Sequence, residues 1–287
     1  MNSPDVKAFF DTASFTVSYV VSDPTTHRAA ILDPVLNFDP VSGRCSTESA
    51  DQMIAYLNEA SLEVDWILET HVHADHLSSA PYLKGQLGGK TAIGAGVTAV
   101  QDEFKTLFNM MDLASDGSQF DQLFDDGESF KLGCIDAQVI ATPGHTPACV
   151  TYVIGDSAYV GDTLFMPDFG TARTDFPGGS AEQLYHSIQK IFALQGDTRL
   201  FMCHDYKAPG RDEFAWETSV KEQRVNNIHI NKNISEAAFV ALREGRDAQL
   251  GVPKLILPSI QVNIRAGQLP DPEDNGIRYL KTPIDAL

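Results

Sequence analysis

The sequence contains little cysteine, and its cysteines lie far apart. Only four occur in 287 residues, and no Cys-x-x-Cys pair is present. The first residues also lack the basic start and apolar stretch of a secretory signal. We therefore expect reduced thiols in a cytoplasmic protein, rather than disulfides or a thiolate metal site. Cys203 closes the apolar run 200–202 and is expected to be a buried structural residue, not a nucleophile.

Long hydrophobic runs and positive charge are also scarce. No stretch approaches the ~18 consecutive apolar residues of a membrane-spanning helix. The 21 Lys and Arg residues against 39 Asp and Glu residues give a formal net charge of −18. Nucleic acids and anionic membranes bind basic surfaces, so we expect neither as a partner. An anionic substrate would have to be bound by a few well-placed cations.

Hydrophobic residues make up 43% of the chain, enough for a large core, and strand and helix patterns alternate along it without a repeat. This alternation predicts an α/β fold, and the absence of a clear linker predicts a single domain over residues 1–287. Strands are expected at 15–21, 29–32, 64–69, 129–132, 135–141, 149–154, 157–160 and 198–203. Helices are expected at 49–60, 180–194, 217–229 and 235–246, the second opened by the capping box Ser180-x-x-Gln183.

Potential metal ligands are concentrated after the ends of predicted strands. Four occur within six residues, and three isolated ones follow later strands: His71, His73, Asp75, His76, His145, Asp162 and His204. Imidazole and carboxylate without thiolate suit Zn, Fe(II) or Mn, and strand ends are where α/β proteins place their sites. The other histidines considered, His27, His186 and His229, are expected to be surface or structural residues.

The pattern Thr70-His71-x-His73-x-Asp75-His76, followed by His145, Asp162 and His204, resembles the metallo-β-lactamase superfamily over essentially the whole chain. This resemblance implies an αββα sandwich in which two mixed β-sheets are flanked by helices. It also implies a metal site at one edge, between the sheets. It does not by itself imply β-lactam hydrolysis, because one fold carries many chemistries.

Two chemistries fit the same residues. In a hydrolase such as glyoxalase II, which cleaves a glutathione thioester, two Zn ions or a mixed Zn/Fe pair would bind. The resemblance then assigns one metal to His71, His73 and His145, and the second to Asp75, His76 and His204. Asp162 would bridge the two metals. Such a pair generates a hydroxide at neutral pH.

The other chemistry is that of the persulfide dioxygenase (sulfur dioxygenase) branch, in which one Fe(II) is held by His71, His145 and Asp162. The resemblance then implies that four residues orient the iron ligands without binding the metal: His73, Asp75, His76 and His204. The flanking sequence favours this branch, through segments 31–36, 142–147, 173–176 and 204–206. The substrates would be glutathione persulfide and O2, and the products sulfite and glutathione.

Glutathione carries two carboxylates, so residues that could bind them were sought near the ligands. Arg173 and Tyr206 are the expected substrate contacts, with Tyr206 also counted as catalytic, and Lys207 and Arg265 are further candidates. The alternative for Arg173 is an ion pair with Asp175 or Asp168. The loop 169–173 differs from the Gly-Cys-Gly-Arg common in the family.

The segment 97–126 resembles an insertion, and 253–287 a C-terminal extension with a Pro-rich start. The apolar residues between 104 and 113 favour a packed extra helix over a lid or a dimer contact. We expect a homodimer, and any sulfurtransferase partner is expected to be a separate protein. A non-catalytic metal-binding scaffold is the remaining alternative, but the complete ligand set argues against it.

Overall fold

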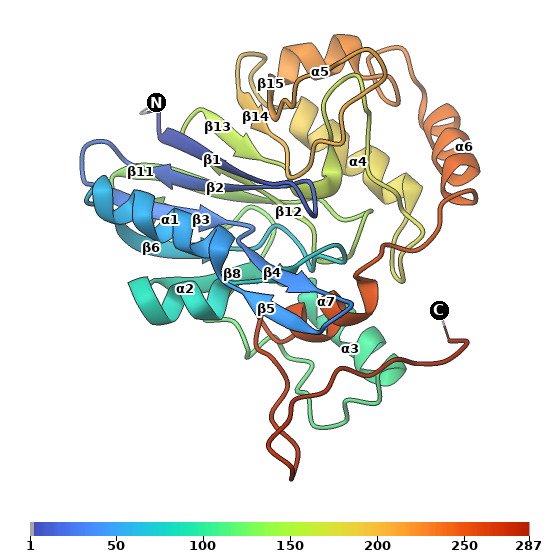
Figure 1. Cartoon of the computed structure of the whole chain (residues 1–287). Helices are drawn as coiled ribbons and strands as arrows, with labels where there is room; N and C mark the ends of the chain where they lie inside the picture. The colour runs from blue at the N-terminus through green and yellow to red at the C-terminus, as the bar shows by residue number, and fades with distance from the viewer. Residues whose placement is uncertain (1–2, 287) are drawn as a thin grey trace.

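Two six-stranded sheets face each other in the computed structural model, which describes residues 3–286 (Figure 1). In order across the first sheet are β1 (Asp5–Asp11), β2 (Thr16–Ser22), β3 (Arg28–Leu32), β6 (Glu63–Leu68), β8 (Lys90–Gly94) and β9 (Gln122–Phe124). The second contains β10 (Ser129–Leu132), β11 (Ile135–Ala141), β12 (Val150–Ile154), β13 (Ser157–Tyr159), β14 (Arg199–Phe201) and β15 (Glu217–Ser219). A small sheet joins β5 (Arg44–Ser46), β4 (Val35–Asp39) and β7 (Leu77–Ser78).

Both large sheets are mixed. In the first, β3, β6, β8 and β9 are parallel neighbours, whereas β1 and β2 are antiparallel; in the second, only β13 and β14 are parallel. The facing sides of the sheets bury an apolar core that includes Tyr19, Leu68, Val139 and Tyr152. Tyr19 also ties the sheets together, because its hydroxyl donates to the carbonyl oxygen of Met202 at 2.6 Å.

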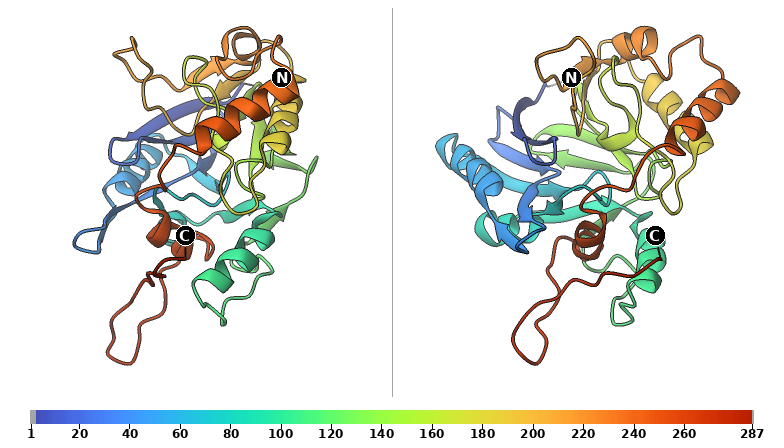
Figure 2. Two further views of the ribbon diagram at one scale, coloured as in Figure 1. Left: turned by 90° about the vertical axis from the view of Figure 1, so that its right-hand side faces the viewer. Right: turned by 45° about the vertical axis from the view of Figure 1, so that its right-hand side comes forward.

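Helices cover the outer faces, as Figure 2 shows from two further directions. On the first sheet lie α1 (Glu48–Glu59) and α2 (Ala80–Leu87), and on the second α4 (Ala181–Phe192), α5 (Val220–Asn226) and α6 (Glu236–Asp247). At one end, α3 (Val97–Leu107) packs against α7 (Ile256–Asn263). The predicted αββα sandwich of α/β class is therefore confirmed. No helix among the described residues is long and apolar enough to cross a membrane.

Most predicted elements are present. Ser180 caps α4 as predicted, because its hydroxyl accepts a hydrogen bond from the Gln183 amide at 3.2 Å. The reciprocal half of the capping box is not formed, because the Ser180 amide donates to the Gly144 carbonyl oxygen at 2.8 Å. The helix predicted at 217–229 is wrong at its start: residues 217–219 form β15, paired with β14, and Ser219 then caps the short α5. After His76, the short strand β7 precedes helix α2, which begins at Ala80.

Strands β1, β4, β5, β7, β8 and β9, and helices α2 and α7, were not predicted. α7 lies within the segment expected to be irregular, and its buried Ile256 and Ile260 pack with Val100 and Phe104 of α3. The apolar residues of 97–126 therefore lie partly in a packed helix. The prediction of one domain over 1–287 extends to residues 1, 2 and 287, which lie outside the described residues.

Candidate metal centre

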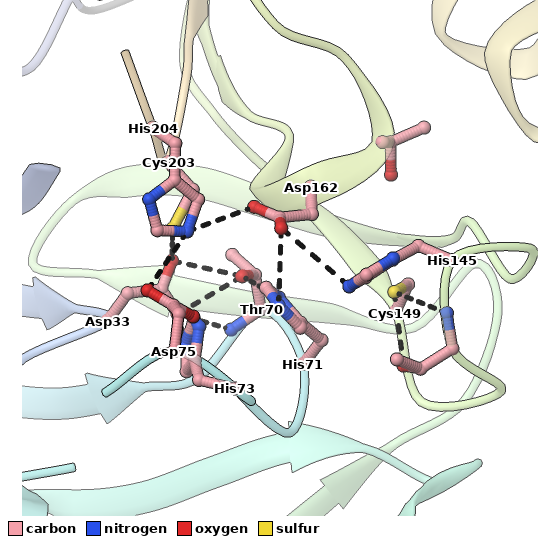
Figure 3. A network of polar contacts seen from close by, with 12 residues as sticks. Asp33, Thr70, His71, His73, Asp75, His145, Cys149, Asp162, Cys203 and His204 are labelled. Atoms are coloured by element: carbon pink, nitrogen blue, oxygen red, sulfur yellow. Dashed lines mark hydrogen bonds and ion pairs between the residues drawn. The ribbon is translucent and has the colours of Figure 1, made fainter. Parts of the chain in front are cut away.

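Four chain segments bring the seven predicted ligands together at one edge of the sandwich, and Figure 3 labels all of them except His76. The loop carrying His71 to His76 follows β6, and His145 follows β11. Asp162 lies in the single 3-10 turn η1 (Gly161–Thr163) after β13, and His204 comes after β14. All are buried except Asp75, which is half-buried. The strand-end placement expected from the sequence therefore yields one cluster.

The carboxylate of Asp162 lies at the middle of this cluster. Its Oδ2 is 3.9 Å from His71 Nε2 and 3.7 Å from His145 Nε2, and its Oδ1 is 3.4 Å from His204 Nε2. His71, His145 and Asp162 form one group whose ligand atoms lie within 4.8 Å of one another. Asp75 is shared by the other half, with Oδ2 3.5 Å from His204 Nε2 and 3.2 Å from His76 Nδ1.

Several buried nitrogen and oxygen atoms of the cluster have no hydrogen-bond partner within the described residues. Among the described residues, the buried atoms without one include His71 Nε2, His73 Nδ1, His76 Nε2, His204 Nε2 and Asp162 Oδ1. Buried polar atoms are rarely left unsatisfied, because each costs free energy. Lone pairs of imidazole and carboxylate directed at one point suit a divalent metal ion, so this residue set fits one.

Burial keeps two of the histidines neutral. Burial, followed by the charges of His73 and His145, lowers the pKa of His71 well below its ordinary value. Burial likewise lowers the pKa of His145, against the opposing charge of Asp162. His145 Nδ1 lies 2.8 Å from the carbonyl oxygen of Arg173. A neutral ring that donates there leaves Nε2 as an acceptor, the form that binds a metal.

Two buried carboxylates lie behind His73, and sequence reasoning did not identify either as part of the site. His73 Nε2 lies 2.9 Å from Asp33 Oδ1 and 3.3 Å from Glu69 Oε2. Burial opposes a charge on His73, but the two carboxylates outweigh it and raise its pKa well above the ordinary value. Asp33 also accepts from the Thr70 amide at 2.7 Å. The signal was the Asp33-Pro34 step after β3, which was used only as flanking sequence.

The nearby thiols are poor candidates for ligands. Burial raises the pKa of Cys149 to about 12, although Thr146 hydrogen-bonds to its sulfur. Burial, with the charge of Asp33, raises the pKa of Cys203 well above its ordinary value. Cys203 lies close to His73 and His204, but a metal binds the thiolate and not the thiol. Cys203 is buried, as expected, just beyond β14.

The four predicted substrate contacts have different surroundings. Arg173 forms a two-point ion pair with Asp175 (Nε–Oδ1 and Nη2–Oδ2 both 2.6 Å), which is the alternative to substrate binding that the sequence left open. Asp168 pairs instead with Arg211. Tyr206, 39% exposed, stacks on the ring of His204.

Lys207 lies over an aromatic ring, and Arg265 lies near a carboxylate. The Lys207 ammonium lies 4.4 Å from the centre of the Phe214 ring, and Arg265 Nη2 is 3.6 Å from Asp112 Oδ2. Binding of substrate by these residues stays a prediction. His186 pairs with Glu236 at the surface, as expected for a surface histidine.

Two further contacts hold the ligand loops. Gly144 has φ +140°, and a Cβ there would lie 2.3 Å from the Leu184 amide nitrogen, so the residue before His145 packs directly on α4. Asn263 of α7 donates to the carbonyl oxygens of His73 and His76 at 2.9 and 2.8 Å. Sequence reasoning missed Asn263, because its partners lie almost 190 residues earlier.

Several known proteins are similar to this chain. A protein of Agrobacterium fabrum described as beta-lactamase hydrolase-like is 55% identical over 99% of this chain, which spans only 65% of that protein. Glyoxylase B2 of Dictyostelium discoideum is 51% identical over 100% of this chain and 99% of its own length. The human mitochondrial persulfide dioxygenase ETHE1 is 30% identical, covering 91% of this chain and 88% of its own.

Among solved structures, the crystal structure of ETHE1 from Myxococcus xanthus matches with a TM-score of 0.74 and 29% identity. It covers 92% of this chain and 100% of its own. Residues 12–204, which contain all seven clustered positions, match the sequence profile of the metallo-beta-lactamase superfamily. The chain belongs to the metallo-β-lactamase superfamily.

Proposed function

We propose that this protein is a persulfide dioxygenase that oxidises glutathione persulfide at one Fe(II). The observation that carries the proposal is the group formed by His71, His145 and Asp162. Two imidazoles and one carboxylate are the ligand set of mononuclear non-haem Fe(II) oxygenases, which keep other positions open. The likeness to human and bacterial ETHE1 over about nine-tenths of the chain supports the same chemistry.

The reaction balances with water as the third source of oxygen. One glutathione persulfide, one O2 and one water give glutathione, sulfite and two protons. The outer sulfur loses four electrons and O2 accepts them, while the S–S bond breaks and its inner sulfur leaves as glutathione. Iron held by these three residues would supply the redox chemistry and the Lewis acidity for this oxidation.

The protein's own groups would orient the reactants and handle protons. Arg173 fixes the tautomer of His145 through its carbonyl oxygen. The hydroxyl of Tyr206, which lines the cleft beside the cluster, is protonated at neutral pH, as a phenol ordinarily is, and can donate to substrate. In this proposal His73, Asp75, His76 and His204 surround the iron without binding it and hold its ligands in place.

A second candidate is a two-metal thioester hydrolase, which cleaves S-lactoylglutathione. It is favoured by unpartnered nitrogens of His73, which would join the first metal, and of His76 and His204, which would bind a second metal with Asp75. The name of the Dictyostelium relative, Glyoxylase B2, points the same way. Both candidates use the same cluster, so metal content and assay must separate them.

The deciding experiment measures O2 uptake by iron-loaded protein given glutathione persulfide, with sulfite assayed in the same vessel. Uptake matched by sulfite and abolished in His71→Ala supports the dioxygenase. No uptake by protein that holds one Fe(II) per chain contradicts it. The zinc-loaded protein is then tested with S-lactoylglutathione.

Partners and location form part of the proposal. We propose a homodimer in the cytoplasm that receives its persulfide from a separate sulfurtransferase. The Agrobacterium relative extends well beyond the length matched by this chain, so its additional part is the first place to look for such an activity. Size-exclusion chromatography with light scattering tests the dimer.

A further inference from the structure

A cleft of about 920 Å³ opens beside the candidate metal centre. Asp75, His76 and Tyr206 contribute to its lining on the metal side. Three other segments complete it: residues 11–15 after β1, residues 35–46 of the β4–β5 hairpin, and residues 253–255 before α7. β4, β5 and α7 lie side by side in Figures 1 and 2. The volume is that of a small-molecule site, so the unreactive part of a substrate would lie here.

Two cations line this cleft, Arg44 and Lys254, and both are exposed. Within residues 3–286, neither forms an ion pair or a hydrogen bond through its side chain. The hydrogen bond from Ser42 and, to a smaller extent, the charge of Arg44 lower the pKa of Asp39, the residue opposite Arg44 on β4. Arg44 and Asp39 do not form an ion pair. Both charges therefore line the cleft without an ion-pair partner among the described residues, and an anionic ligand bound there would pair with them.

The acidic residues of the cleft wall are already satisfied by their own turns. Asp11 Oδ2 accepts from the Ser14 amide at 2.8 Å and from the Ser14 hydroxyl at 2.7 Å. Asp39 accepts from the Val41 amide at 3.0 Å and from the Ser42 hydroxyl at 2.5 Å. These hydrogen bonds hold Asp11 and Asp39 within their own turns, and neither carboxylate forms an ion pair with Arg44 or Lys254 within the described residues.

The cations predicted from the sequence are less available. The guanidinium of Arg173 is occupied by Asp175 and by the Gly251 carbonyl oxygen, and Arg173 is not part of the cleft lining. Arg265 faces Asp112. The cleft wall therefore contains its own pair of cations, drawn from segments that the motif does not include.

We propose that Arg44 and Lys254 bind the two carboxylates of the glutathione moiety and so select a thiol whose tail carries two carboxylates. Phe15, Phe38 and Leu255 of the same wall would contact its aliphatic parts. An extended tripeptide reaches roughly 10 Å, within what a cleft of this volume can hold. The inference rests on the proposed function for the identity of the reaction. S-lactoylglutathione, the substrate of the alternative hydrolase, carries the same glutathione tail.

The test compares Arg44→Gln, Lys254→Gln and the double variant in the iron-loaded protein. The KM for glutathione persulfide and the Kd for glutathione, by anaerobic calorimetry, are each expected to rise about fivefold per substitution, with kcat unchanged. Arg44→Lys should retain most of the affinity. Lys221→Gln, an exposed lysine of α5 outside the cleft, is the charge-matched control. With glutathione dimethyl ester, the variants and the wild type should bind equally.

The outcomes separate the two proposals. O2 uptake with a wild-type KM and Kd in the double variant overturns the assignment of Arg44 and Lys254 while the dioxygenase stands. No O2 uptake, together with a Kd for glutathione that depends on both residues, overturns the dioxygenase while the assignment stands. A variant that weakens binding of the dimethyl ester as much as binding of glutathione also overturns the assignment, because the substitution then acts on something other than the carboxylates.

Discussion

The Nδ1 atom of His145 and the carbonyl oxygen of Arg173 lie 2.8 Å apart, so a backbone loop sets the tautomer of a candidate metal ligand. The loop is itself anchored to α6. Asp247 Oδ2 accepts from the Thr174 amide at 2.8 Å, and Arg243 Nη1 donates to the Thr171 carbonyl oxygen at 3.0 Å. A helix beyond the motif thus holds His145 through two intermediate contacts.

The first prediction concerns the ion pair that anchors this loop. Arg243 and Asp247 are 2% and 4% exposed and join at 2.8 Å. In Asp247→Asn the guanidinium stays buried without a charge partner, so the free energy of unfolding should fall by about 3 kcal/mol. Chemical denaturation measures this, and Glu244→Gln on the exposed face of α6 is the control. The iron affinity should also fall, since the loop at Thr174 loses its anchor. An unchanged iron affinity would show that α6 does not support the metal centre.

The second prediction concerns Gly170, at the start of the same loop. Its φ is +105°, and a Cβ there would lie 2.1 Å from His229 Nδ1. Gly210 has a similar φ of +91° but nothing within 4 Å. Gly210→Ala should therefore cost about 1 kcal/mol of stability, from backbone strain alone. Gly170→Ala should cost at least about 3 kcal/mol, because the buried imidazole must move. Equal losses in thermal unfolding would contradict the packing argument.

The third prediction is a pH dependence that arises from His229. Burial, followed by the charges of Arg243 and Arg246, lowers its pKa to about 4. The unfolded chain, with an ordinary pKa near 6.5, binds a proton between these values that the folded protein does not. Stability is therefore lost as the pH falls from about 6.5 toward 4, by about 2 kcal/mol at pH 5 from this residue.

The measurement is urea denaturation at pH 7.5 and pH 5 for the wild type and His229→Gln. The variant should lose about 2 kcal/mol less over this range, after both proteins are brought to the same metal content. Equal losses in the two proteins would show that His229 titrates normally. The comparison between variants removes the contribution of the clustered histidines, because it is common to both proteins.

Residues close together in the sequence could be predicted, and long-range partners could not. The spacing from His71 to His76 and the strand ends before His145 and Asp162 were enough to foresee one cluster, because parallel and neighbouring strands present their ends at a common edge. The roles of these residues as ligands stay predictions. Strand and helix patterns are also features of short sequence segments, so they could be predicted and they indicated the α/β class of the sandwich.

Contacts that support the cluster come from distant parts of the chain. Asp33 reaches His73 across 40 residues, Arg243 reaches Thr171 across 72, and Asn263 reaches His73 across 190. Nothing in their own sequence windows marks these partners, because an Asp, Arg or Asn beside apolar residues also occurs in ordinary loops and helices. The strand β15 was missed for a similar reason: Glu217–Ser219 pairs only with β14, and its own composition is polar.

The last prediction separates one metal from two by means of His73. Glu69 contacts the cluster through one histidine only: its Oε2 lies 3.3 Å from His73 Nε2, and its Oε1 accepts from Ser78. In the proposed dioxygenase His73 does not bind iron, so Glu69→Gln should change the iron affinity by less than about threefold. Asp33→Asn is the positive control, because Asp33 holds Thr70, whose hydroxyl lies 3.0 Å from His71 Nδ1.

Iron affinity is measured by competition with a chelator, and metal content by elemental analysis. Asp33→Asn should weaken iron at least about tenfold, the usual effect of removing a partner that orients a ligand. A comparable loss in Glu69→Gln would place His73 among the ligands and favour the two-metal hydrolase. The two-metal hydrolase would be supported further if the zinc-loaded wild type held two zinc ions per chain and zinc-loaded Glu69→Gln held one.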